Sequence, residues 1–168
     1  MEFIAEAEVT AGSPTSLSIT GIPSDYRNLE FVFLLRNDST GDNQALLTFN
    51  NVTTASYYWG HIYRTSPFDG PYFFATNEGS IPVRVADDTN PANVFAPSRV
   101  QMPNANSSDR KALTMNTARP KPGQNFGQRP YQIASRVEIF SPITTVTITQ
   151  PVGLKVGSKI YVYGTRSE

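Results

Sequence analysis

Residues 143–165, ITTVTITQPVGLKVGSKIYVYGT, carry the clearest strand pattern in the chain. In the first half of this stretch, Val146 and Ile148 alternate with threonines, so one side is apolar and the other polar. In the second half, Ile160 and Val162 repeat the alternation after a turn with two glycines and a proline. Apolar side chains at every second position predict half-buried strands rather than helices.

Upstream of this pair, LEFVFLLR at residues 29–36 is apolar on both sides. Its odd-numbered positions are all Leu or Phe, and Val32 and Leu34 occupy even-numbered ones. Such a strand is expected in the middle of a sheet, with both of its faces covered.

The opening residues 2–9 behave differently, because three glutamates share one side of the stretch with Ile4. Phe3 begins the other side, which continues with alanines and a valine. One charged side and one apolar side predict a half-exposed edge strand.

The rest of the chain repeats these short signals between turn residues. Further strands are predicted at residues 16–20, 45–49, 57–64, 72–76, 81–86, 99–102, 112–116 and 131–140. About ten short strands predict an all-β fold, a β-sandwich or jelly-roll-like domain, and one such domain accounts for residues 1–168.

The composition excludes several classes of partner. Basic and acidic residues balance at fourteen each, whereas nucleic-acid binding needs a basic excess, so we expect no nucleic acid. There is no cysteine for disulfides, zinc thiolates or nucleophiles. No apolar run approaches the roughly 20 residues of a membrane span, and the acidic start MEFIAEAEV differs from a signal peptide. We therefore expect no membrane partner and folding in the cytoplasm.

One segment, about residues 104–130, stands apart by charge. It contains five basic residues against the single acid Asp109. Within it, residues 118–130 (ARPKPGQNFGQRP) hold three prolines and one large apolar residue, Phe126. This composition predicts a long polar loop or extended arm.

The chemistry-bearing residues favour a protein that is not an enzyme, with no catalytic residues, cofactor or metal. His61 is the sole histidine and is better explained as a strand residue than as a base. The loops at 38–43 and 87–90 offer oxygen atoms for calcium, but Asp and Asn are also ordinary turn formers, and the turn interpretation is favoured. A glycan-cleaving enzyme is the weakest alternative, since it requires two facing carboxylates roughly 5–10 Å apart.

A dense group of aromatic residues supports a second interpretation. It consists of Tyr57, Tyr58, Trp59, Tyr63, Phe68, Tyr72, Phe73 and Phe74. Most of these suit the core and rim of a sandwich, but exposed members could stack on sugars. An exposed Trp59 beside a groove would favour a carbohydrate-binding receptor module, and a buried Trp59 would count against it.

Two ends of the chain resemble tailed-bacteriophage virion proteins. The first, FIAEAEVTAGSPTSLSITGIPSDYRNLEFVFLLRND, carries the turn and strand motif Ile22, Pro23, Tyr26, Leu29, Arg36 and Asp38. The second, ITTVTITQPVGLKVGSKIYVYGTRSE, is similar to their final hairpin at Gly157, Ser158, Tyr163 and Gly164. A weaker likeness lies at residues 104–116. Together the two ends cover about 70 residues of the chain.

The resemblance implies a head decoration (cement) protein, or alternatively a receptor module of a tail or head fibre. It implies a place on the capsid exterior of the virion, self-association as a homotrimer, and the major capsid protein as partner. The N-terminal strand and the arm are the segments expected to bind the capsid and neighbouring subunits. Their interface candidates are Phe3, Ile4, Arg119, Lys121, Phe126 and Arg129.

Overall fold

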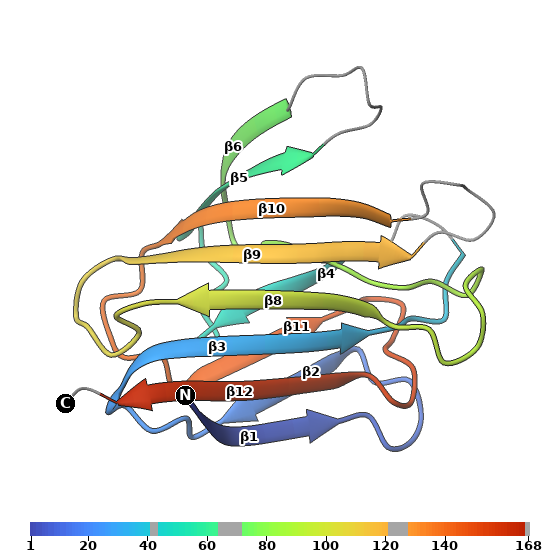
Figure 1. Cartoon of the computed structure of the whole chain (residues 1–168), viewed down its shortest axis with the longest axis horizontal. Coiled ribbons are helices and arrows are strands. Elements are labelled where there is room, and N and C mark those ends of the chain that lie inside the picture. The colour runs from blue at the N-terminus through green and yellow to red at the C-terminus, as the bar shows by residue number, and fades with distance from the viewer. Residues whose placement is uncertain (41–43, 64–71, 121–127, 167–168) are drawn as a thin grey trace.

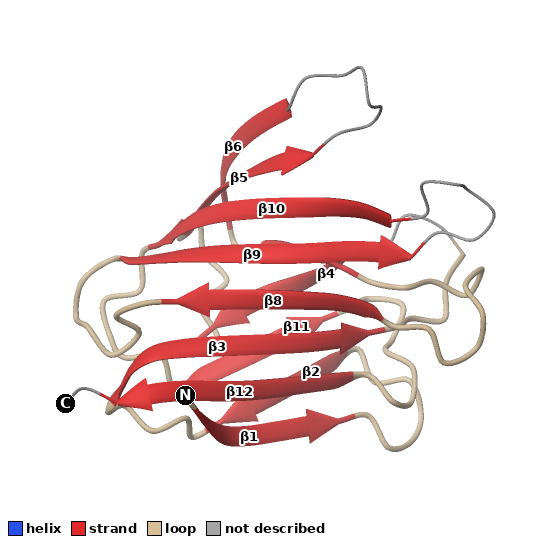
Figure 2. Cartoon of the chain, viewed as in Figure 1, coloured by secondary structure: helices blue, strands red, loops and turns tan. Residues whose placement is uncertain are grey.

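The structure is a computed structural model that describes residues 1–40, 44–63, 72–120 and 128–166; within these ranges the side chains at 61–63, 72–76, 119–120 and 128–131 are not described. The described chain consists of strands and loops (Figure 2). The strands are β1 (Glu2–Glu8), β2 (Ser16–Thr20), β3 (Tyr26–Leu35), β4 (Gln44–Phe49), β5 (Tyr57–Tyr63), β6 (Tyr72–Glu78), β7 (Ile81–Arg84), β8 (Ala96–Met102), β9 (Lys111–Pro120), β10 (Gln128–Val137), β11 (Thr145–Thr149) and β12 (Lys159–Arg166). The prediction of an all-β fold is confirmed. Among the described residues no helix has the length and apolar character to span a membrane.

Two antiparallel sheets form a sandwich (Figure 1). The larger has eight strands in the order β1-β12-β3-β8-β9-β10-β5-β6, and the smaller has four in the order β2-β11-β4-β7. The smaller sheet lies behind the β12-β3-β8 part of the larger one, whereas β5 and β6 curve away from the layer (Figure 1). The first and last strands of the chain are neighbours, so its two ends are joined in one sheet.

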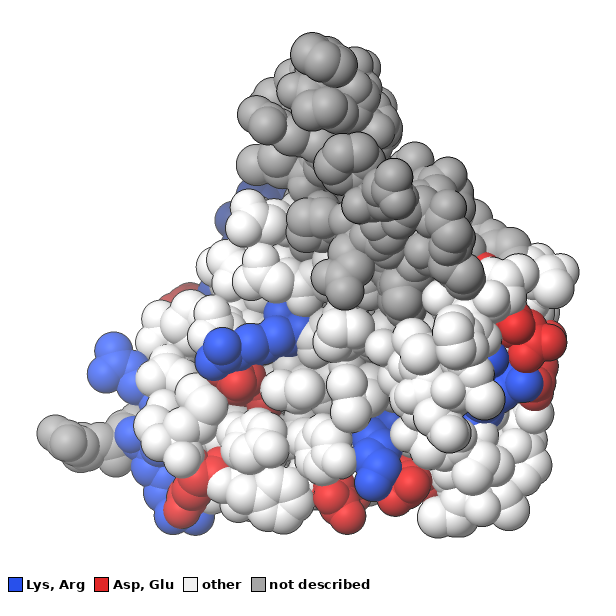
Figure 3. Space-filling view, turned by 45° about the vertical axis from the view of Figure 1, so that its right-hand side comes forward, with Lys and Arg blue, Asp and Glu red and all other residues white. Residues whose placement is uncertain are grey.

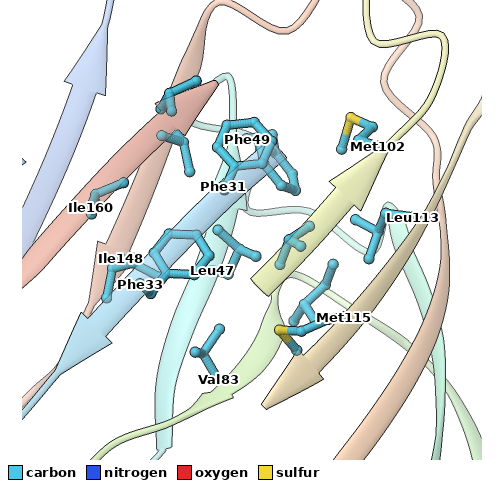
Figure 4. Packing of buried hydrophobic residues seen from close by; sticks show 14 of the residues in the cluster. Phe31, Phe33, Leu47, Phe49, Val83, Met102, Leu113, Met115, Ile148 and Ile160 are labelled. Atoms are coloured by element: carbon cyan, nitrogen blue, oxygen red, sulfur yellow. The ribbon is translucent and has the colours of Figure 1, made fainter. Parts of the chain in front are cut away.

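The core lies between the sheets and is built from the apolar side of each strand. Phe31 and Phe33 of β3 face Leu47 and Phe49 of β4, and all four are fully buried (Figure 4). The rings of Phe31 and Phe49 lie 5.2 Å apart between their centroids. The alternation that predicted the strands is therefore the alternation between core and surface.

The strands β11 and β12 do not form the final hairpin that the resemblance implies. β11 pairs with β2 and β4 in the smaller sheet, and β12 pairs with β1 and β3 in the larger. The turn of residues 150–158 therefore crosses from one sheet to the other. Glycine is needed there, because Gly153 and Gly157 have φ angles of 87° and 88°.

A β-bulge in the first strand reverses which of its first side chains face the core, compared with the prediction. The register of β1 against β12 shifts between Phe3 and Ala5. The extra residue turns Phe3 toward solvent, where it is 55% exposed, and lets Ile4 pack against the core. The edge strand was predicted correctly, but the sides of these two residues were exchanged.

The predicted arm is much shorter than 104–130. Residues 111–120 and 128–137 form the hairpin β9–β10, and Leu113 and Met115 of β9 are buried in the core. The side of β9 that faces away from the core carries the short side chains of Ala112, Thr114 and Asn116, whereas the basic Lys111 lies on the core side and is buried. The remaining stretch, 121–127, lies outside the described residues.

Three buried polar side chains fasten the connections between strands. Lys111 is 1% exposed, and its ammonium donates to the carbonyl oxygens of Ser107, Asp109 and Ile139 at 3.0, 3.1 and 2.6 Å. Burial lowers the pKa of this amine. Arg36 similarly donates to the carbonyl oxygens of Asn90 and Pro91, and Tyr57 donates to that of Val52.

Candidate interaction surface

The side of the larger sheet that faces away from the smaller one, here called the outer face, is the broadest feature outside the core. Its charged side chains gather in separate clusters with uncharged surface between them (Figure 3). The strand registers arrange its side chains in rows that run across the strands. One row consists of Phe3, Tyr163, Glu30, Gln101, Thr114, Ala134 and Gly60.

The half of this face formed by β1, β12 and β3 carries large side chains, and we call it the aromatic half. The ring of Phe3 lies 5.7 Å from that of Tyr163 in an edge-to-face arrangement. Tyr161 is opposite Val32 in the adjoining row, with Leu34 two residues further along β3. Tyr163, Tyr161, Val32 and Leu34 are only half-buried. These four side chains therefore leave apolar surface in contact with solvent.

The half formed by β8, β9, β10 and β5 carries short side chains at its centre, with the longer Arg99, Gln101, Gln132, Arg136 and Tyr58 around them, and we call it the small-residue half. Thr114, Ala134 and Gly60 lie side by side on β9, β10 and β5. Two open hollows meet there, of about 570 and 250 Å³, and both are lined by Thr114 and Ala134. Carboxamides border them, with Gln101 beside the larger hollow and Gln132 beside the smaller.

Two cations on the outer face, Arg99 and Arg136, have partners within the chain. Arg99 on β8 binds Glu30 on β3 at 2.6 Å, and Gln101 donates to the same carboxylate oxygen at 3.3 Å. The hydrogen bond to Glu30 raises the pKa of the Arg99 guanidinium. Arg136 lies over the ring of Tyr58, 4.2 Å from its centroid. The face therefore offers area and shape to a partner more than net charge.

The predicted interface residues fall into four different situations. Phe3 is exposed in the aromatic half, whereas Ile4 faces inward. Arg119 and Arg129 are register partners on β9 and β10. Lys121 and Phe126 lie outside the described residues.

The short side chains of the small-residue half were missed in the sequence. Their signal was present, because Ala112, Thr114 and Asn116 alternate with the buried side of β9. Small residues on an exposed side give no hydropathy contrast, and the segment was assigned to an arm for its charge.

The aromatic cluster does not form a stacking platform in its described part. Tyr57 is fully buried, the face of Tyr58 is covered by Arg136, and Trp59 packs partly buried against the core. The Trp59 indole N–H donates to the carbonyl oxygen of Ser80 at 3.1 Å. His61 lies on β5 as expected, and its side chain is among those not described.

The two loops considered for calcium meet around a lysine. The ammonium of Lys155 lies 2.9 Å from carboxylate oxygens of both Asp38 and Asp88. A hydrogen bond from Ser13, reinforced by Lys155, lowers the pKa of Asp38, and Lys155 lowers that of Asp88. A glycosidase acid needs a raised pKa, so this pair lacks the electrostatics for that reaction. In the described ranges no three His, Cys, Asp or Glu side chains gather as a metal site.

No protein-family model matches the sequence, and no curated protein matches it either.

Proposed function

We propose that this chain is a structural subunit of a tailed-bacteriophage particle that decorates the head and binds the lattice of the major capsid protein. The observation that carries the proposal is a set of contacts between the two terminal stretches that resemble virion proteins. These stretches are more than 100 residues apart in the sequence, yet they supply neighbouring strands of both sheets, β1-β12-β3 and β2-β11.

The first contact joins Arg36 and Ser158. The Ser158 hydroxyl accepts a hydrogen bond from the Arg36 N–H at 3.2 Å and donates to the Arg36 carbonyl oxygen at 3.1 Å. The guanidinium of Arg36 in turn donates to the carbonyl oxygens of Asn90 and Pro91 at 3.1 and 2.8 Å. Both motif residues are buried, so their identities follow from their place in the fold.

The second contact joins Tyr26 and Gly164. A Cβ atom at Gly164 would lie 2.9 Å from Cγ of Tyr26 and 2.8 Å from Cδ1 of Ile4, so a side chain there would displace both. The Tyr26 hydroxyl donates to Glu2 at 2.7 Å, which fastens β1 to the same unit. These contacts join the separated motifs into one structural unit, which is the basis of the proposal.

Binding is also favoured over sugar recognition at the aromatic cluster. Trp59 is engaged with the core and with the Ser80 carbonyl, which weighs against the receptor module that would stack sugars on it. A decoration subunit would act by mass action. Because it binds the assembled lattice across subunit boundaries, it would stabilise the shell against disassembly.

Co-sedimentation of the purified protein with phage shells that lack it tests the proposal. We expect saturable binding at a fixed ratio to the major capsid protein, together with a raised temperature of shell disruption. Absence of binding to shells, with binding on a glycan array, would reject decoration in favour of the receptor module.

A variant of the same protein tests the expected grip. Replacing residues 121–127 by a Gly/Ser linker of equal length removes Lys121 and Phe126, and we expect weaker shell binding. The control is the same replacement of the exposed turn at residues 53–55, which should bind like the parent protein. Equal binding by both variants would exclude this segment as the grip.

A further inference from the structure

The central strand β3 is apolar on both sides, but only one side is covered by the chain itself. Val32 and Leu34 point away from the core and are half-buried, and Figure 1 shows no described segment in front of β3. A strand of this pattern is normally covered on both faces. The sequence thus indicates a second layer over the outer face, and the chain does not supply it in its described part.

The arrangement of large and small side chains indicates what that layer is. Across the row that contains Glu30, the side chains run from Phe3 and Tyr163 on one half to Thr114 and Ala134 on the other. The boundary between the two halves lies between β3 and β8, with three strands of the aromatic half on one side. Three strands of the small-residue half, β8, β9 and β10, lie on the other.

We propose that the outer face binds a second copy of this chain in a two-fold symmetric dimer, with the axis parallel to the strands and between β3 and β8. Rotation about this axis places the aromatic half of each copy over the small-residue half of the other. Tyr163 then lies over Thr114, and Phe3 over Ala134. Each contact occurs twice, as a two-fold interface requires.

The acidic side chains of the face are compatible with this pairing. The Glu30–Arg99 ion pair lies beside the proposed axis, so two neutralised pairs meet at the centre of the interface. Glu30 faces the carboxamide of Gln101 in the partner copy, and Glu6 faces that of Gln132. Carboxamide N–H groups can donate to both carboxylates, so no buried acid is left without a donor.

The area is sufficient for a stable contact. Six strands at about 4.8 Å spacing and six residues at about 3.3 Å give a flat area near 600 Å² on each copy. The total, about 1,200 Å², is at the lower end of the range for specific interfaces. Two sheets packed face to face at about 10 Å would also bury Val32 and Leu34.

Light scattering after size exclusion tests the inference directly. We expect a mass twice that of the 18.5 kDa chain at micromolar concentration. Ala134→Arg fills the larger hollow and should weaken dimerisation at least about tenfold, with the circular dichroism spectrum unchanged. Thr20→Arg, at an exposed strand position on the smaller sheet, is the matched control and should remain dimeric.

A mixing experiment tests the pairing itself. Tyr163→Glu and Thr114→Lys should each be monomeric alone, and an equimolar mixture should form a heterodimer, because one of its two contacts becomes Glu over Lys. A monomeric parent protein, a dimer unaffected by Ala134→Arg, or no heterodimer on mixing would overturn the inference. The resemblance predicts a homotrimer, and a threefold mass would also overturn it. The inference is independent of the proposed function, because shell binding is measured separately.

Discussion

The hydroxyl of Tyr57 on β5 is buried against Phe49, the last residue of β4. It accepts a hydrogen bond from the Phe49 N–H at 2.8 Å and donates to the Val52 carbonyl oxygen at 3.0 Å. Burial raises the pKa of Tyr57 to about 12. The phenol thus stays neutral in the folded protein at pH values where it ionises in the unfolded chain, near pH 10.

This difference predicts how stability changes in alkali. The contribution of the neutral phenol is fully present below about pH 10, is lost as the pH rises toward 12, and amounts to about 2–3 kcal/mol. Tyr57→Phe should cost about 1–3 kcal/mol at pH 7, because it leaves the Phe49 N–H without its acceptor. Urea unfolding of both proteins between pH 8 and 11.5 measures the effect. A difference between them that does not shrink above about pH 10 would contradict this account.

Asn50 fastens the turn after β4 to the segment that leads into β11. Its φ angle is +50°. Its amide group donates to the Pro142 carbonyl at 2.8 Å and accepts from the N–H groups of Thr144 and Thr145 at 2.9 and 3.1 Å. Asparagine is among the few residues that adopt this backbone conformation readily, and here its side chain also satisfies two backbone donors.

The neighbouring residue provides a matched control for Asn50. Asn51 also has a positive φ, of 56°, but its side chain accepts only one long hydrogen bond, of 3.5 Å, among those described. We expect Asn50→Ala to lower the free energy of unfolding by about 2–4 kcal/mol and Asn51→Ala by about 1 kcal/mol. Denaturant unfolding measures both, and equal losses would show that backbone strain alone is responsible.

At the scale of the elements, Lys155 in the connection between β11 and β12 forms ion pairs with two other loops, one containing Asp38 and one containing Asp88. Its ammonium binds Asp38 and Asp88, which raises the pKa of the amine. The lowered pKa values of the two carboxyls mean that their contribution is present above the ordinary Asp value, near 4, and is lost as the pH falls through the folded values.

Lys155→Met should therefore change the acid response of the protein. We expect the variant to be less stable than the parent at pH 6 and to lose less stability between pH 6 and 3, because its carboxyls titrate closer to their ordinary range. Urea midpoints at both pH values measure this. Lys159→Met, which removes the 2.8 Å pair with Glu8 on the larger sheet, controls for the loss of one positive charge. Parallel acid curves for the parent and Lys155→Met would refute the assignment.

The strands themselves were largely predictable, because alternation records which side of a strand meets the core. Val146 and Ile148, or Ile160 and Val162, are fully buried as that rule requires. Alternation does not record which strand lies alongside which. β11 and β12 were therefore predicted as strands but joined into a hairpin that the sandwich does not contain.

The candidate surface was harder to predict, for two physical reasons. The β-bulge in β1 exchanged the sides of Phe3 and Ile4, and a bulge leaves no trace in the hydropathy pattern. The small-residue half combines side chains of β5 with those of the β9–β10 hairpin, which lie far from β5 in the sequence and meet it only through strand register. A surface formed by short side chains from separate strands leaves no motif in any one stretch of the sequence.

At the scale of the whole molecule, the sandwich depends on pairing between the two ends of the chain. β12 lies between β1 and β3, so the larger sheet is incomplete until the last strand has formed. Such distant pairings are slow to form, because loop closure precedes the contacts that stabilise it. We expect folding in milliseconds to seconds, monitored through the fluorescence of Trp59, the only tryptophan.

The order of strands in the sheet, rather than in the sequence, should decide which end the fold can lose. Deleting residues 1–8 removes β1, an edge strand that pairs only with β12 in the described sheet. This variant should stay folded, with a lower but cooperative melting transition. Deleting residues 159–168 removes β12, whose Ile160 and Val162 are fully buried in the core, and strips both neighbours of their partner. This second variant should lose its cooperative transition and aggregate. Circular dichroism melting and size exclusion compare the two, and equal behaviour would mean that the β1-β12-β3 unit is not the centre on which the fold depends.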